Sequence, residues 1–301
     1  MKKTAIASPA GDIQLSLIYC TPKSEPKGIV QIAHGMCEHK ERYIPLMEFL
    51  AGNGFAVVCN DHRGHGESVA DKEDLGYMGK GGWLAAVNDL KAVSDWAKGQ
   101  WPGIPLTLFG HSMGSLLVRS YAKRYDDGIA SLIVCGCPSD NPAKGAGMML
   151  ARIIGTVRGW HYRPRILQNL SFGSYNKPFA GEGWAAGWVC SDREVLEAYH
   201  ADPLCQYIFT ADGFLNLLLL MKDCYSVGEK TQHPELPVRF ISGSEDPCRI
   251  SDKDLEAAVG QMRKRGYRDV TLKVYPGMRH EIHNETGRQE VWDDILSYCV
   301  S

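Results

Sequence analysis

Short apolar runs alternate with amphipathic helical segments through the first part of the chain. Continuous apolar runs predict buried strands at residues 28–33, 55–59, 106–109 and 129–136, and residues 12–20 alternate as an exposed antiparallel strand does. Apolar positions recur at helical spacing in the segments 42–51, 83–98 and 115–122. Because strands that alternate with helices form mostly parallel sheets covered on both faces, this order predicts an α/β fold.

The alternation stops between residues 138 and 234, where no buried strand pattern occurs. That stretch instead contains helical patterns at residues 145–157, 193–200 and 213–225. A Gly- and Trp-rich segment lies among them at residues 172–188. The α/β pattern then resumes with strands at 238–241 and 270–275 and helices at 252–265 and 286–299. We therefore predict an α/β core made of residues 1–137 and 235–301, with residues 138–234 as a helical cap insertion.

Composition excludes several classes of protein. The 301 residues carry a formal charge of −2 with both signs mixed, which gives no footprint for nucleic acid and no polybasic membrane segment. The ten cysteines form no regular framework, so we expect free thiols in a reducing compartment. The start lacks the apolar region of a signal peptide, and the most apolar run, 214–221, is far shorter than a membrane span. A soluble cytoplasmic protein of undetermined oligomeric state is expected.

The segment Gly110-His111-Ser112-Met113-Gly114 is the strongest chemical signal in the chain. It is a Gly-x-Ser-x-Gly sequence between a predicted strand and a predicted helix, which is the context that a nucleophile elbow requires. The glycines allow a sharp turn that exposes the hydroxyl of Ser112. We predict that Ser112 is a nucleophile.

A nucleophilic serine needs a base to take its proton and an acid to orient that base. The acid is expected after a later strand, where Asp246 follows residues 238–241 and Glu245 is its rival. The base is expected after the next strand, where His280 is the candidate and His283 the rival. The expected oxyanion donors are the backbone N–H groups of Met113 and Met36, the latter from an early strand–helix loop.

Five motifs stand out along the chain: His34-Gly35-Met36-Cys37-Glu38-His39 with Arg42-Tyr43, residues 60–68 (Asn-Asp-His-Arg-Gly-His-Gly-Glu-Ser), residues 110–114, residues 242–247, and residues 276–281 with Asn284-Glu285. Through these motifs the chain resembles the monoglyceride lipase and lysophospholipase branch of the α/β-hydrolases over residues 12–298. The resemblance implies the α/β-hydrolase fold, an acyl-enzyme on Ser112, the triad Ser112–Asp246–His280, the oxyanion hole at Met36 and Met113, and no cofactor. It also implies a small ester or lipid substrate, most often a monoacylglycerol or a lysophospholipid.

The cap insertion would supply the acyl site in such a family. Its apolar candidates for contact with substrate are Met148, Met149, Phe209, Phe214 and Leu218, each of which could equally pack inside the cap. A thioesterase, amidase or peptidase on the same triad and a non-catalytic binding module remain the alternative functions. An apolar rim on the cap would allow at most transient contact with a membrane or micelle.

Cysteine, histidine and arginine side chains outside the predicted triad are expected to have structural roles near the active site. Cys248 is expected close to the triad, where thiol reagents would block the site, but no motif makes it a nucleophile. His62, Arg63 and His65 are expected to organise loops under the active site. No set of carboxylates and histidines has ligand spacing, so no metal site is predicted.

Overall fold

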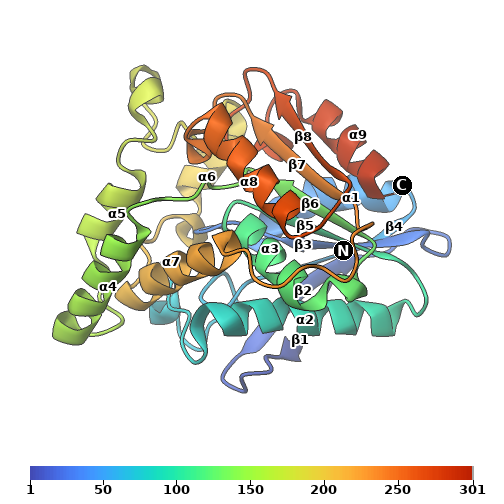
Figure 1. Ribbon diagram of the computed structural model, residues 1–301, viewed down its shortest axis with the longest axis horizontal. Coiled ribbons are helices and arrows are strands. Elements are labelled where there is room, and N and C mark those ends of the chain that lie inside the picture. The colour runs from blue at the N-terminus through green and yellow to red at the C-terminus, as the bar shows by residue number, and fades with distance from the viewer. Residues whose placement is uncertain (300–301) are drawn as a thin grey trace.

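An eight-stranded sheet forms the centre of the molecule in the computed structural model, which describes residues 1–299 (Figure 1). The strand order is β1-β2-β4-β3-β5-β6-β7-β8. The strands are β1 (Lys2–Ala7), β2 (Gln14–Cys20), β3 (Gly28–Ala33), β4 (Phe55–Asn60), β5 (Leu106–His111), β6 (Ser131–Cys135), β7 (Val238–Gly243) and β8 (Val270–Tyr275). The β1–β2 and β2–β4 pairs are antiparallel and all later pairs are parallel, which confirms the predicted mostly parallel sheet.

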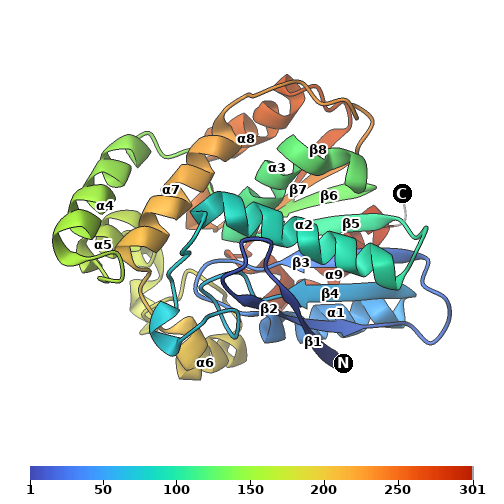
Figure 2. The same ribbon diagram turned by 90° about the horizontal axis from the view of Figure 1, so that it is seen from below.

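Helices cover both faces of this sheet, as Figures 1 and 2 show. The helices of the α/β core are α1 (Ile44–Gly52), α2 (Gly82–Gln100), α3 (Met113–Tyr125), α8 (Asp252–Lys264) and α9 (Arg288–Cys299). Helices α2, α3 and α8 pack on one face, and α1 and α9 pack on the other. The parallel strands β3, β4, β5 and β6 are therefore buried on both sides, which explains their mostly apolar sequences.

The central strands point their side chains alternately into two hydrophobic cores. In β3, for example, Ala33 belongs to the core beneath α2 and α3, whereas Ile32 belongs to the core beneath α1 and α9. All six residues of β3 and all six of β5 are buried. The carboxyl ends of these two strands are consequently held rigidly, and the loops that follow them start from fixed positions.

Four helices lie between β6 and β7, where the cap insertion was predicted. They are α4 (Lys144–Arg158), α5 (Arg165–Phe172), α6 (Arg193–Ala201) and α7 (Ala211–Tyr225). Helix α7 packs against α2 and α3 of the core, and α4 packs on α7. In both views α4 and α5 lie at one end of the molecule (Figures 1 and 2). The exact boundaries of the insertion at residues 138 and 234 remain a prediction.

Two elements were not predicted from the sequence. Strand β1 pairs with β2 at the edge of the sheet, with Lys2 opposite Tyr19, although its apolar residues are few. Helix α5 lies almost wholly in residues 158–171, to which no element was assigned, because its eight residues show little more than two helical turns of pattern. Both elements lie at the periphery, where burial imposes the weakest pattern on a sequence.

No helix within residues 1–299 is long and apolar enough to cross a lipid bilayer. All ten cysteines are free thiols, as expected, and most are buried.

Candidate active site

Ser112 occupies a strained turn between β5 and α3. Its backbone angles are φ 53° and ψ −118°, a conformation that costs about 1–3 kcal/mol and is found mainly at functional sites. Glycines make the turn feasible. A Cβ atom at Gly110 would lie 2.4 Å from the carbonyl oxygen of Gly114, and one at Gly114 would lie 2.0 Å from that of Ala33. The predicted elbow therefore exists, and it needs both glycines.

His280 and Asp246 form a buried pair beside this turn. The Nδ1 of His280 lies 2.9 Å from Oδ1 of Asp246, and the same oxygen accepts a hydrogen bond from the backbone N–H of Cys248 at 2.8 Å. Asp246 follows β7 and His280 follows β8, as predicted. His280 and Ser112 line the same cavity. The three residues predicted as a triad are thus brought to one edge of the sheet.

The charge of Asp246 controls the protonation of His280. Burial lowers the pKa of the His280 imidazole, but the adjacent carboxylate outweighs burial and raises the pKa well above 6.5. The contact of Nδ1 with the Asp246 carboxylate favours the tautomer with its proton on Nδ1, which leaves Nε2 free to accept one. Such a ring can accept a proton on Nε2 and hold it as an imidazolium.

The two rival residues lie in different surroundings. Glu245 is exposed, and its nearest cationic contact is Nε of Arg279 at 4.0 Å. His283 is fully buried, stacks on the Tyr43 ring with centroids 4.9 Å apart, and faces His111 at 4.8 Å. Burial and the neighbouring His111 lower the pKa of His283 well below 6.5. Neither rival faces the cavity, so the structure favours Asp246 and His280.

Cys248 lies against the catalytic pair, as expected. Its Sγ is 3.9 Å from Nε2 of His280. Burial raises the pKa of the Cys248 thiol to about 11, so the sulfur is protonated and weakly nucleophilic near neutral pH.

Met36 and Met113 line the same cavity as Ser112, and the role of their backbone N–H groups as oxyanion donors stays a prediction. The loop that carries Met36 lies directly on the elbow. A Cβ atom at Gly35 would lie 3.0 Å from Cβ of Ser112 and 2.5 Å from Oε1 of Glu38. Gly35 was not singled out from the sequence, although the loop that contains it was.

A buried ionic network supports this loop from below. Glu38 accepts hydrogen bonds from the backbone N–H of Gly35, from Tyr43 Oη at 3.0 Å and from Nη1 of Arg42 at 3.1 Å. Arg42 also forms a bidentate pair with Glu281, at 2.5 and 2.7 Å. Because Glu281 follows His280, the network connects the loop before α1 to the loop of the candidate base. Sequence reasoning noted these residues only as motif matches.

The histidines of the second motif pack together under the site, as predicted. The His62 backbone N–H donates to Nε2 of His34 at 3.0 Å, and the rings of His34 and His65 lie 5.2 Å apart. Burial lowers the pKa of His62 to about 3 and that of His65 to about 4, so both are neutral. Arg63 is buried and binds Asp89 at 2.8 Å.

A cavity of about 520 Å³ opens above Ser112 between the core and the cap insertion. Of the five apolar side chains expected to meet substrate, only Leu218 lies in its wall. Phe209 and Phe214 are buried in the hydrophobic core instead. Met148 also lies outside the wall, and Met149 is 61% exposed to solvent. The apolar wall comes instead from residues that the sequence did not mark: Leu116, Phe172, Trp188, Val189, Leu217 and Met221.

The cap insertion also braces the loop of His280. The His280 N–H donates to the carbonyl of Trp188 at 3.4 Å, and the Glu281 N–H donates to Val189 at 2.8 Å. The indole of Trp188 lies 5.0 Å from the His280 ring, between centroids. This contact was not predicted, because only the fold brings residues 188 and 280 together.

Comparison with known proteins supports the same interpretation. The family model Hydrolase_4, described as serine aminopeptidase, S33, matches residues 24–287. The monoacylglycerol lipase of Mycolicibacterium smegmatis is 28% identical over 295 residues, which cover 97% of this chain and 94% of that protein. The human monoglyceride lipase is 26% identical over 89% of this chain and 80% of its own length.

The fold has a near counterpart among solved structures. The crystal structure of a highly thermostable carboxyl esterase from Bacillus coagulans, in complex with glycerol, superposes with a TM-score of 0.88 at 25% identity. The alignment covers 100% of this chain and 99% of that one. The predicted α/β-hydrolase fold is therefore confirmed.

Proposed function

The chain belongs to the Hydrolase_4 family, and from this premise we propose that it is a serine hydrolase that cleaves carboxylic esters, with monoacylglycerols or lysophospholipids as its substrate class. The observation that carries the proposal is the His280–Asp246 pair at 2.9 Å, whose His280 lines one cavity together with the strained Ser112. A buried imidazole paired with a carboxylate, in one cavity with a half-buried serine hydroxyl, is the apparatus of acyl transfer.

In the proposed reaction, Ser112 Oγ attacks the ester carbonyl while Nε2 of His280 takes the hydroxyl proton. Asp246 holds the ring and stabilises the imidazolium. The backbone N–H groups of Met36 and Met113 receive the oxyanion, and each such donor is worth about 3–4 kcal/mol. His280 returns the proton to the leaving alcohol, then activates a water molecule that hydrolyses the acyl-enzyme on Ser112.

The shape and chemistry of the cavity support an acyl substrate. Its volume of about 520 Å³ is that of a small-molecule site, and aliphatic and aromatic side chains form much of its wall. The curated relatives named above are monoacylglycerol lipases, and the similar solved structure is a carboxyl esterase that holds glycerol. These names and the apolar wall together favour a fatty acyl ester over a polar one.

The family description names an aminopeptidase, so peptide hydrolysis is the second candidate function. An aminopeptidase must bind the ammonium group of its substrate, which requires an available carboxylate in the cavity. The carboxylates in its wall, among residues 1–299, are Glu38 and Glu281, and Arg42 already neutralises both. The electrostatics of the cavity therefore favour the ester.

Two helices of the cap insertion offer a surface suited to lipid aggregates. Helix α4 exposes an apolar stripe of Met149, Ile153 and Val157, and α5 exposes Ile166 and Leu170, all at more than half of full exposure. The stretch 141–181 around them contains six Lys or Arg residues and no Asp or Glu. An apolar stripe with basic neighbours fits an interface rich in anionic lipid.

A fluorophosphonate probe tests the nucleophile. We expect labelling of the wild-type protein and none of Ser112→Ala, together with hydrolysis of monoacylglycerols but not of aminoacyl p-nitroanilides. Labelling that survives in Ser112→Ala would remove Ser112 from the mechanism. Preference for the aminoacyl substrate would replace the lipase proposal by the peptidase alternative.

A further inference from the structure

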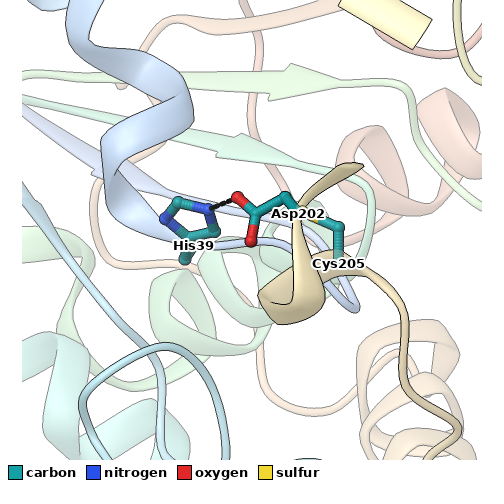
Figure 3. Close-up of side chains that lie close together, drawn as sticks. All are labelled: His39, Asp202 and Cys205. Atoms are coloured by element: carbon teal, nitrogen blue, oxygen red, sulfur yellow. Dashed lines mark hydrogen bonds and ion pairs between the residues drawn. The ribbon is translucent and has the colours of Figure 1, made fainter. Parts of the chain in front are cut away.

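The cap insertion meets the core at three side chains that can bind a metal ion: His39, Asp202 and Cys205 (Figure 3). His39 directly precedes the short helix η1 (Lys40–Tyr43) of the core, whereas Asp202 and Cys205 belong to the start and end of η5 (Pro203–Cys205) in the cap insertion. One ligand atom of each residue lies within 4.8 Å of the other two. An imidazole nitrogen, a carboxylate oxygen and a sulfur are ligands that Zn²⁺ takes in proteins.

Neighbouring groups hold two of these ligands in position. His39 has Nδ1 2.7 Å from Oε2 of Glu41 and Nε2 2.6 Å from Oδ2 of Asp202. The backbone N–H of Leu204 donates to the other oxygen of Asp202 at 2.8 Å. A histidine that binds zinc through one ring nitrogen usually donates a hydrogen bond from its other ring nitrogen to a carboxylate, which fixes the orientation of the ring. In His39, Glu41 would provide this support at Nδ1, and Nε2 would bind the metal.

The cluster is sheltered but has an open side. His39 is 7% exposed and Cys205 is 3% exposed, whereas the Asp202 side chain is 29% exposed. An ion can therefore enter past Asp202, and a water molecule can complete a tetrahedral shell from the same side.

We propose that His39, Asp202 and Cys205 form a Zn²⁺ site that cross-links the cap insertion to the core. The ion replaces the proton between Nε2 of His39 and Asp202 and the proton of the Cys205 thiol, so both protons are released to solvent on binding. Because Cys205 also lines the cavity above Ser112, a bound ion fixes that part of the cavity wall.

A second cluster with the same donor types must be separated from the first. Asp246, Cys248 and His280 also lie within 4.8 Å of one another. The test therefore uses Cys248→Ser protein, in which only the proposed site keeps its thiol. Zn²⁺ binding is measured by equilibrium dialysis, and Co²⁺ is used as a spectroscopic substitute.

We expect Cys248→Ser protein to bind one Zn²⁺ per chain and to give a thiolate-to-Co²⁺ charge-transfer band. Both signals should vanish in Cys248→Ser/Cys205→Ser, which lacks the thiol of the proposed site. The Cys248→Ser/Asp202→Asn protein should bind Zn²⁺ at least about tenfold more weakly, because the change replaces a carboxylate ligand by an amide. Zn²⁺ at a hundredfold excess over Kd should raise the Tm of Cys248→Ser protein by about 4 °C.

The proposal is overturned if folded Cys248→Ser protein binds no Zn²⁺ or gives no thiolate band. It is also overturned if Zn²⁺ binding is unchanged in the Asp202→Asn variant, which serves even where Cys205→Ser fails to fold. These measurements involve no ester hydrolysis, so their outcome is separate from that of the proposed function.

Discussion

Gly35 shows how a single missing side chain shapes the active site. A methyl group at this position would press on Cβ of Ser112 and, more severely, on Oε1 of Glu38. The loop that carries Met36 would have to move away from the elbow, and the proposed oxyanion donor would move with it. We expect Gly35→Ala to lower kcat by about 100-fold or more, the effect of losing one such donor, as measured on p-nitrophenyl butyrate.

Gly99 provides the matched control for this substitution. It lies near the end of α2, and a Cβ atom there meets nothing within 4 Å. Gly99→Ala should leave kcat unchanged and stabilise the protein by about 0.5–1 kcal/mol, because alanine has the higher helix propensity. Equal losses in both variants would show that the effect at Gly35 is not local.

Asp246 sets the pH dependence of the proposed reaction. His280 must be neutral to accept a proton, and its pKa is raised well above 6.5 against the opposing effect of burial. Activity should therefore fall as the pH falls through that raised value, with the acid limb of kcat/KM above pH 6.5. In Asp246→Asn, burial acts without the carboxylate, so the limb should shift to lower pH while kcat drops by about 10⁴-fold.

Glu245 is the control for Asp246, because it is the adjacent carboxylate but lies exposed outside the cavity. Glu245→Gln should keep the acid limb in place and change kcat by less than about twofold, as expected of a screened surface charge. An acid limb that moved in Glu245→Gln but stayed in Asp246→Asn would reverse the assignment of the acid.

At the scale of elements, helix α7 contributes Leu218 to the wall of the cavity. Leu218→Trp should fill part of the acyl site and lower kcat/KM for palmitate esters by about tenfold or more, while kcat/KM for butyrate esters stays near that of wild type. Met149→Trp is the control, since Met149 is exposed on α4 and lies outside the cavity wall. Equal losses for short and long esters would mean that Leu218 does not contact the acyl chain.

Helices α4 and α5 carry the proposed lipid-facing surface. Ile153→Ser/Leu170→Ser should reduce hydrolysis of monoacylglycerol in anionic vesicles by about tenfold and leave hydrolysis of soluble p-nitrophenyl butyrate unchanged, because the removed apolar area contacts only the interface. Leu84→Ser, which removes a 41% exposed leucine from α2, should alter neither rate. A parallel loss on the soluble ester would instead indicate damage to the fold.

At the scale of elements, the strands of the core could be predicted from the sequence, whereas the packing of the cap helices could not. The central strands were found because both of their faces are apolar, and Asp246 and His280 were found because each follows a predicted strand. Phe209 and Phe214 were misplaced because the face that a helix presents to a cavity depends on how the whole cap insertion packs. Local sequence contains no record of that packing.

The proposed zinc ligands escaped notice for a related reason. His39 and Asp202 are 163 residues apart, and metal spacing patterns in a sequence detect only ligands from the same loop or helix. The contacts between residues 187–189 and 279–281 are equally invisible along the chain. Such information exists only in the folded molecule.

At the scale of the whole molecule, Arg279 joins the cap insertion to the loop of the candidate base. The Arg279 guanidinium donates to the carbonyls of Gly187 at 2.6 Å and Cys190 at 3.1 Å, and it pairs with Glu182. It also lies 4.0 Å from the ring centroid of Phe179. All four partners belong to the cap insertion, while Arg279 itself precedes His280.

Arg279→Met should therefore weaken stability and catalysis together. Loss of the charged hydrogen bonds leaves buried carbonyl groups unpaired and should cost about 3 kcal/mol in the free energy of unfolding, measured by urea denaturation. Because the His280 N–H bonds to Trp188 in the same segment, a loosened segment misplaces the imidazole, and kcat/KM should fall by about tenfold.

Arg288 is the matched control, because it also joins the core to the cap insertion, through Asp192 at 3.1 Å, but its side chain is 41% exposed. Solvent screens that pair, so Arg288→Met should cost less than about 1 kcal/mol and leave kcat/KM unchanged. If both variants lose the same stability and both keep full activity, the cap insertion does not help to position His280. If Arg279→Met alone loses activity, the cap insertion acts on the triad by holding the base in place.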